Sequence, residues 1–343
     1  MTAFKVVSGF FSRAAINGLC NVHGRIYSRS KNGRKITGWS SDLPQSAHSV
    51  NLPQEEVASR IDRIRIPVVT DLPTAVEQSS LLQKLVDMGV NLHRLKYNPG
   101  LCKFLIGADY EKDIAPFLQF LESNGVSQEC LPVFISRNPD IFLCDLDDLQ
   151  VRINYLESKK FTKEMIANII TKNPKWLLFE VKFIDSRLGY LQNSLNLSGD
   201  EIRKLAVIFP RVMNIKKELL ELNLFTIKEE LGLEKPDIKK IVFEVPNILR
   251  IDNDTLIATF RFLLNHMGIQ EHLLIGQPKI LTCRAHVLSA RHHFLCKLGR
   301  AQYNPKLPGY VPLSDLCCTN DLEFCKNIAK VPLDDFYKFL KSL

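Results

Sequence analysis

Apolar residues recur in the middle of the chain at the spacing of one helix face, in four successive segments. Each segment follows one polar residue: Ser127, Thr162, Ser198 or Glu234. Counted from that residue, positions +4, +7 and +8 are apolar every time: Leu131, Phe134, Ile135, Ile166, Ile169, Ile170, Ile202, Leu205, Ala206, Ile238, Ile241 and Val242. Because such positions share one helix face, the pattern predicts four amphipathic helices. Ser and Thr are favoured N-caps, and Ser198 with Glu201 forms a capping-box pattern.

A proline ends each segment and recurs at a nearly constant interval. The prolines are Pro99, Pro139, Pro174, Pro210, Pro246 and Pro278, each followed two positions later by an apolar residue. Proline disfavours helical backbone in the residue before it, so each helix should stop there. We expect the apolar cluster after it to open a short second helical element, and a further helix to follow, as at 145–160 and 183–195. Intervals of 40, 35, 36, 36 and 32 residues predict a stacked helical-repeat solenoid.

The repeats define the domain organisation. Shortened helices are expected before Pro99 and Pro278, and residues 332–343 are expected to cap the end of the array. We therefore assign residues 81–343 to the repeat domain. Residues 42–80 contain several prolines and few periodic apolar positions, which predicts a linker.

The first 41 residues differ in composition from the rest. They contain seven basic residues, no acidic residue and many Ser and Ala, which is typical of a mitochondrial transit peptide. Arg25 precedes a plausible cleavage position near residue 27 by the distance that matrix processing favours. A disordered basic arm is the alternative interpretation. No apolar run approaches the roughly 20 residues that a membrane span needs.

The net charge has to be considered by segment. The formal charge is +8, and the first 41 residues supply most of it. Residues 42–150 contain 9 basic and 16 acidic residues, whereas residues 151–343 contain 29 basic and 21 acidic residues. This asymmetry indicates an anionic partner for the C-terminal part.

The repeat pattern resembles the mitochondrial transcription termination factor (mTERF) family. The resemblance rests on P-x-[LIV] corners preceded by G-[LVI]-[ST] starts, and covers roughly residues 81–343. The tail FLCKLGRAQYNPKLPGYVPLSDLC, with EFCKNIAKVPLDDFYKFLKSL after it, is similar to the third animal paralogue of the family. Pentatricopeptide arrays have a similar period but no recurrent P-x-apolar corner.

This resemblance implies an all-α solenoid of repeats with two α-helices and one 3₁₀ helix each, curved into a half-ring. It also implies a mitochondrial matrix protein that binds mitochondrial DNA near the promoter region, ribosomal RNA, or both. For the third paralogue it implies repression or modulation of transcription, and support for assembly of the large mitochondrial ribosomal subunit. The alternative function is a scaffold for a protein partner, such as an RNA-modifying enzyme.

Two sets of basic residues are candidate nucleic-acid contacts. Arg152, Arg187 and Arg291 share an Arg-x-x-aromatic-Leu pattern. They either contact phosphates, one per repeat, or lie along the aromatic ring and bond the carbonyl or acidic groups of the next repeat. The second set lies near the corners: Lys175, Arg211, Lys216, Lys217, Arg250 and Arg284. These cations either contact phosphates or belong to a solvated face.

Signatures of catalysis, cofactors and metals are missing from the sequence. Phosphate-cradling loops, dinucleotide fingerprints, zinc-protease motifs and nucleophile elbows do not occur. The nine cysteines show neither CxxC pairs nor zinc-finger spacing, which predicts reduced thiols. His292 and His293 have no third ligand at suitable spacing. We therefore expect a protein that is not an enzyme, with no catalytic residues, no cofactor and no metal.

Overall fold

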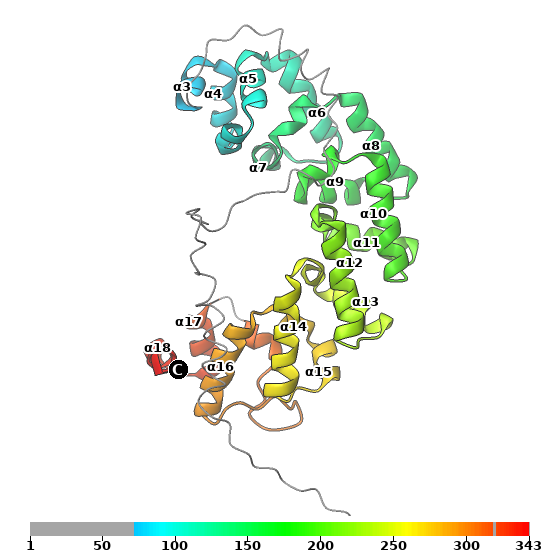
Figure 1. The fold of residues 1–343 in the computed structure, drawn as a ribbon. Coiled ribbons are helices and arrows are strands. Elements are labelled where there is room, and N and C mark those ends of the chain that lie inside the picture. Colours follow the sequence, from blue (N-terminus) through cyan, green and yellow to red (C-terminus); the bar gives the residue numbers. More distant parts are fainter. Residues whose placement is uncertain (1–71, 318–319, 343) are drawn as a thin grey trace, which may run out of the picture. The chain divides into compact units, whose positions relative to one another are not determined.

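The computed structural model describes residues 72–317 and 320–342, and these residues form helices without any strand (Figure 1). The α-helices are α3 (Leu72–Gln78), α4 (Ser80–Asp87), α5 (Pro99–Gly107), α6 (Ala115–Ser123), α7 (Leu131–Arg137), α8 (Leu146–Ser158), α9 (Lys163–Lys172), α10 (Val181–Ser194), α11 (Gly199–Ile208), α12 (Lys217–Phe225), α13 (Lys235–Glu244), α14 (Asn253–Arg261), α15 (Glu271–Gly276), α16 (Ala285–Lys297), α17 (Asp321–Glu323) and α18 (Leu333–Ser342). The predicted all-α repeat fold is confirmed.

Short 3₁₀ helices follow the corner prolines, as expected. They are η4 (Pro139–Leu143), η5 (Pro174–Leu178), η6 (Pro210–Asn214), η8 (Pro246–Arg250) and η10 (Pro278–Thr282). Pro99 differs, because it begins the α-helix α5 and a 3₁₀ helix, η1 (Leu92–Tyr97), precedes it. Asn98 explains this difference in part, since its side chain caps α5 by accepting a hydrogen bond from the Leu101 amide.

The capping signals give mixed outcomes. Ser198 and Glu201 form the predicted capping box of α11, and Thr162 accepts a hydrogen bond from the Met165 amide at the start of α9. Ser127 instead precedes a 3₁₀ turn, η3 (Gln128–Cys130), and makes no side-chain cap. Glu234 precedes α13 without a side-chain cap as well. The apolar face is therefore a better guide to these helices than the cap.

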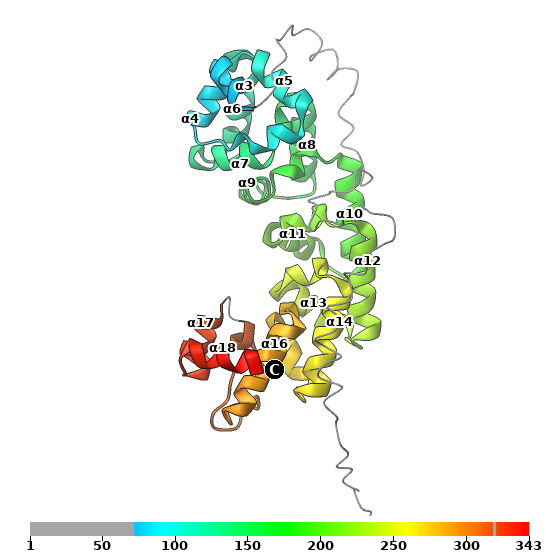
Figure 2. The ribbon, with the colours of Figure 1, turned by 60° about the vertical axis from the view of Figure 1, so that its left-hand side comes forward.

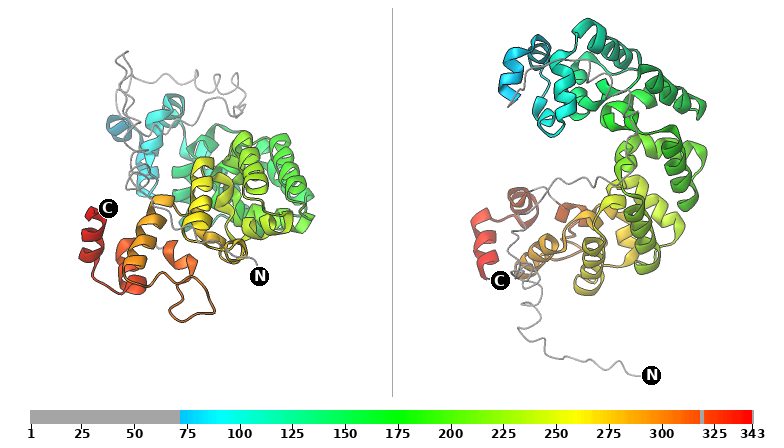
Figure 3. Two further views of the ribbon diagram at one scale, coloured as in Figure 1. Left: turned by 60° about the horizontal axis from the view of Figure 1, so that its bottom comes forward. Right: turned by 45° about the horizontal axis from the view of Figure 1, so that its top comes forward.

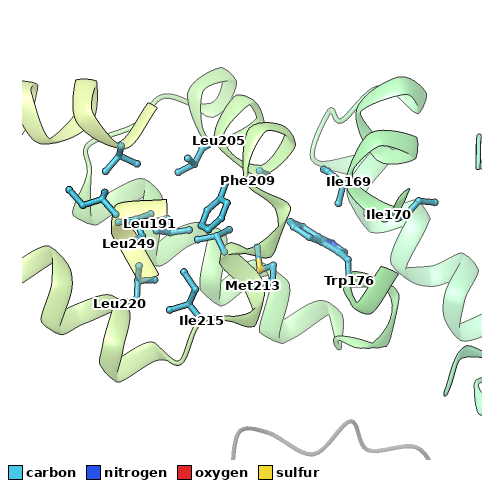
Figure 4. Packing of buried hydrophobic residues seen from close by; sticks show 14 of the residues in the cluster. Ile169, Ile170, Trp176, Leu191, Leu205, Phe209, Met213, Ile215, Leu220 and Leu249 are labelled. Carbon is cyan, nitrogen blue, oxygen red and sulfur yellow. The ribbon is translucent and has the colours of Figure 1, made fainter. Parts of the chain in front are cut away.

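The core lies where the apolar pattern places it. Every predicted apolar position on α7, α9, α11 and α13 is buried. Trp176, at the corner after α9, is fully buried, and Figure 4 shows it between Ile169 of its own repeat and Met213 of the next. The apolar residue after each proline thus fills the layer between neighbouring repeats, which one repeat alone could not bury.

A residue with positive φ follows the second helix of each repeat. These residues are Gly89, Gly125, Lys160, Asn196, Gly232, Gly268 and Gly299. A left-handed residue ends a helix by bonding its orphan carbonyl groups, and glycine adopts this conformation at least cost. Before Gly232 and Gly268 the helix closes with a single π turn, η7 (Thr226–Glu230) and η9 (Phe262–His266).

The two ends of the array differ from the central repeats. Residues 72–80, inside the predicted linker 42–80, form α3 and the start of α4, and Ala75 and Ser79 are buried. The remaining linker residues and the predicted transit segment 1–41 lie outside the described residues. At the C-terminal end α16, α17 and α18 lie together (Figures 2 and 3), and α18 buries Phe336 and Phe339. No helix in the described ranges has the length and apolarity to cross a membrane.

Candidate nucleic-acid interface

In the five repeats that follow Pro139, Pro174, Pro210, Pro246 and Pro278, a side chain on the second helix hydrogen-bonds to the backbone of the next corner. The donor always lies 13 positions after a corner proline. The donor-to-acceptor contacts are Arg152 Nε to the Phe179 carbonyl (3.0 Å), Arg187 Nη1 to Ile215 (2.6 Å), Asn223 Nδ2 to Ile251 (2.8 Å), Thr259 Oγ1 to Cys283 (2.8 Å) and Arg291 Nη1 to Leu316 (2.6 Å). We call these five contacts the bracing bonds.

The bracing bonds decide between the two interpretations of the repeated arginines. Arg187 is 6% exposed and Arg291 is 2% exposed, and the Arg152 side chain is 12% exposed. Arg291 also pairs with Asp321 at 2.9 Å. Arg152, Arg187 and Arg291, predicted as candidate nucleic-acid contacts, lie between repeats and bond the next corner, which favours the alternative interpretation and leaves little guanidinium surface for phosphate.

Asparagines before the prolines form a second set of links. Asn138 Nδ2 donates to the Pro174 carbonyl, and Asn173 Nδ2 donates to the Pro210 carbonyl, each at 2.9 Å. Both asparagines are buried. Successive corners are thus fixed to one another through side chains, so that residues on neighbouring corners keep a constant separation.

A basic groove lies across these linked corners, and we call it the corner groove. Its lining residues come from η1, from the ends of α7 and α9, from η5, η6 and η8, and from the start of α12. They are Arg94, Arg137, Lys172, Asn173, Pro174, Lys175, Arg211, Asn214, Ile215, Lys216, Leu219 and Arg250. None of these twelve residues is acidic, so the groove concentrates positive charge from successive repeats.

The cations of the corner groove are not neutralised by the protein. None of the ion pairs among the described residues includes a groove cation. Other basic residues of the array are paired, for example Lys217 with Glu221 at 3.5 Å and Lys239 with Glu201 at 2.7 Å. A surface that gathers unpaired cations is suited to bind a polyanion, because each contact releases condensed counterions.

The groove contains four of the nine predicted contacts: Lys175, Arg211, Lys216 and Arg250. Lys217 and Arg284 are exposed but do not line it. Sequence reasoning missed Arg94, Arg137 and Lys172. The sequence does carry a signal for Arg137 and Lys172, because each lies two residues before a corner proline. Lys175 and Arg211 each lie one residue after a corner proline. Arg94 carries no such signal; its guanidinium is placed by a hydrogen bond to the Arg137 carbonyl.

The histidine pair is held by packing and hydrogen bonds. His292 Nδ1 lies 2.9 Å from the Tyr303 hydroxyl, and its ring packs edge-on against Phe262. Burial, followed by the nearby His293 and His266, lowers the pKa of His292 to about 4. Within the described ranges no three His, Cys, Asp or Glu side chains are placed to hold a metal ion. His292 is therefore a neutral packing residue at neutral pH.

Comparison with known proteins gives consistent matches over most of the chain. A family model described as mTERF matches residues 102–324. The chain is 38% identical over 272 residues to a Drosophila melanogaster protein named "Transcription termination factor 3, mitochondrial", covering 79% of this chain and 77% of the relative. Rattus norvegicus and Mus musculus proteins of the same name are 35% and 34% identical over 325 and 345 residues. These matches cover 92% and 93% of this chain, and 80% and 84% of the relatives.

Proposed function

The chain belongs to the mTERF family, and on that premise we propose that it binds mitochondrial nucleic acid through the corner groove and thereby regulates mitochondrial gene expression. The observation that carries this proposal is the set of seven unpaired cations in one groove without an acidic lining residue. Binding is then a matter of phosphate neutralisation and shape, and the protein acts by occupancy rather than catalysis.

The finer assignment rests on the relatives. Their printed name, a mitochondrial transcription termination factor, supports action in the mitochondrion. We propose the matrix as the compartment in which the protein acts. We propose that the targets are promoter-region mitochondrial DNA and ribosomal RNA, so that the protein modulates or represses transcription and supports assembly of the large ribosomal subunit. Both targets offer the same phosphate chemistry to the groove.

The test removes three positive charges from the groove and compares the resulting affinity with that of a variant that loses three positive charges elsewhere on the surface. In the first variant Arg211, Lys216 and Arg250 become Gln. In the control variant Lys182, Lys240 and Lys326, which are exposed and lie outside the groove, become Gln. We expect the groove variant to bind duplex DNA and RNA more weakly whatever the sequence. Its slope of log affinity against log salt on duplex DNA should shrink by up to about 2.7 units.

The control variant should retain most of the affinity, and both variants should melt close to the wild type, because exposed charges each contribute less than about 1 kcal/mol. Equal losses of affinity in the two variants would show that binding follows net charge and not the groove. Unchanged binding with a lower melting temperature would show that the groove cations support the fold.

A protein-binding scaffold remains the second candidate, and one observation favours it. On α12, Leu222 is 47% exposed and Phe225 is 59% exposed, and Phe225 borders a hollow also lined by Tyr190 and Leu224. Exposed aromatic residues beside a hollow are typical anchors for a protein partner. If Phe225→Ala abolished recovery of a matrix protein with the purified chain while nucleic-acid affinity stayed constant, this second function would gain support.

A further inference from the structure

One cation of the corner groove has a different environment from the others. Arg94, Arg137, Lys172, Arg211, Lys216 and Arg250 are all exposed, whereas Lys175 is half-buried. Burial lowers the pKa of the Lys175 ammonium, and the nearby Arg94 guanidinium lowers it further, while Asp140 acts in the opposite direction. The ammonium group of Lys175 is therefore less hydrated than the other groove cations and shares the groove with a like charge that acts on it, Arg94, which is unfavourable in the free protein.

Neighbouring contacts hold this unfavourable arrangement in place. Arg94 is fixed through its hydrogen bond to the Arg137 carbonyl. Asp140 Oδ1 accepts a hydrogen bond of 2.8 Å from Asn98 Nδ2, and no ion pair joins Asp140 to Lys175. The backbone position of Lys175 on η5 is in turn set by the Asn138 amide, which binds the Pro174 carbonyl. These links fix the Arg94 guanidinium and the backbone of Lys175 on the same groove.

An anion between the two cations would replace their repulsion by two attractions. A phosphate group offers several acceptor oxygens, which suit both the ammonium and the guanidinium donors. A half-buried cation gains more from such a partner than an exposed one, because its charge is screened less by water.

We propose that Arg94 and Lys175 form a discrete phosphate-binding site in the corner groove, which anchors one phosphate group of the bound nucleic acid. That the bound phosphate belongs to a nucleic acid rests on the proposed function. The site itself would accept any phosphate oxyanion, including free inorganic phosphate. Because it anchors a phosphate, this site contributes more to affinity than the exposed groove cations do.

The main test uses Lys175→Met, which keeps the unbranched stem and removes the charge, with Lys216→Met as the matched control in the same groove. We expect Lys175→Met to lower affinity for an RNA or duplex DNA of about 20 nucleotides or base pairs by about tenfold or more. Lys216→Met should lower it by about threefold or less. In the free protein Lys175→Met should raise the melting temperature by about 2 °C, because the like-charge contact is gone.

The opposite signs of these two effects separate a phosphate anchor from a structural lysine. A lysine that braces the fold would lower the melting temperature when replaced. Asp140→Asn supplies a second variant: it removes the carboxylate that would repel a phosphate, so it should tighten nucleic-acid binding. A weaker complex with Asp140→Asn, or a lower melting temperature with Lys175→Met, would overturn the proposal.

Inorganic phosphate distinguishes the free ion from the polymer. Millimolar phosphate should raise the melting temperature of the wild type relative to chloride at equal ionic strength, and this rise should disappear in Lys175→Met. If phosphate acts in this way but no nucleic acid binds, the site stands and the proposed function fails. If nucleic acid binds and Lys175→Met behaves like Lys216→Met in both assays, the proposed function stands and the site is overturned.

Discussion

The guanidinium of Arg187, buried between two repeats, donates a 2.6 Å hydrogen bond from Nη1 to the backbone carbonyl of Ile215 at the end of the next corner. The same guanidinium lies over the Phe183 ring, 5.2 Å from its centroid. A basic residue that the sequence offered as a phosphate contact is thus engaged inside the protein, and its substitution should act on stability.

Arg187→Gln should lower the free energy of unfolding by about 1–3 kcal/mol, because the Ile215 carbonyl loses its buried donor. The salt slope of nucleic-acid binding should not change. Urea denaturation and salt-dependent binding measure the two quantities on one sample. Arg211→Gln is the matched control, because Arg211 is exposed. It should leave the urea midpoint unchanged and reduce the slope of log affinity against log salt by about 0.9 units on duplex DNA.

Ile169→Asp should cost about 3–5 kcal/mol, since Ile169 is fully buried on α9 and the new carboxylate would have no partner in the layer between repeats. Because neighbouring repeats share this layer, amide hydrogen exchange should accelerate in the flanking helices α7 and α11 as well. Asn168→Asp introduces the same charge at the adjacent exposed position. Thermal melting that did not distinguish the two variants would mean that the repeat register is wrong.

Gly125→Ala should destabilise the protein more than Gly232→Ala. Both glycines have positive φ, 88° and 68°, so an added side chain is strained at either position by roughly 1 kcal/mol. At Gly125 the new Cβ would also lie 2.7 Å from the Ala167 Cβ, whereas nothing lies within 4 Å at Gly232. Equal losses of stability in chemical denaturation would show that the contact between the Gly125 turn and α9 can relax.

The free energy of unfolding should fall as the pH is lowered, because of His292. The unfolded chain binds a proton there below about pH 6.5, its usual pKa, whereas the folded protein does so only near pH 4. Because protons bind preferentially to the unfolded state in this window, the free energy of unfolding falls as the pH is lowered from 6.5 towards 4. His292→Phe should flatten this dependence, and the exposed His272→Phe should leave it intact.

Mitochondrial import should remove the first residues of the chain, with a new N-terminus near residue 27. The acid-free, Arg- and Ser-rich composition of residues 1–41 supports this expectation. N-terminal sequencing or mass spectrometry of the protein from isolated mitochondria measures it. Recovery of a chain that still starts at Met1 would favour the basic-arm interpretation.

The fold was accessible from the sequence because its signals are local. Helix faces, corner prolines and capping residues act within about ten positions, so the burial of Ile202 or Leu205 follows from neighbours in the chain. The corner groove is different in kind. Arg94 and Arg137 are 43 positions apart and meet only because the repeats stack, so their proximity cannot be deduced from spacing alone.

The bracing bonds show a second limit. The Arg-x-x-aromatic-Leu pattern found three donors and missed Asn223 and Thr259, because the fold requires only a hydrogen-bond donor at that place and not an arginine. The constant offset of 13 positions from the corner proline would have found all five. Position within the repeat is therefore more informative here than residue type.

The chemical variety of these five donors also sets distances. An arginine reaches about 7 Å from its Cα atom, whereas a threonine hydroxyl reaches less than about 3 Å, by ordinary bond lengths. Thr259 therefore bonds its corner over a short reach, whereas Arg187 bonds its corner through a terminal nitrogen at the end of a long side chain. At five junctions one position thus accepts side chains of different length, which allows the spacing between helix and corner to differ from one junction to the next. We expect a substitution at that position to act on one junction of the array and to leave the two helices that it joins intact.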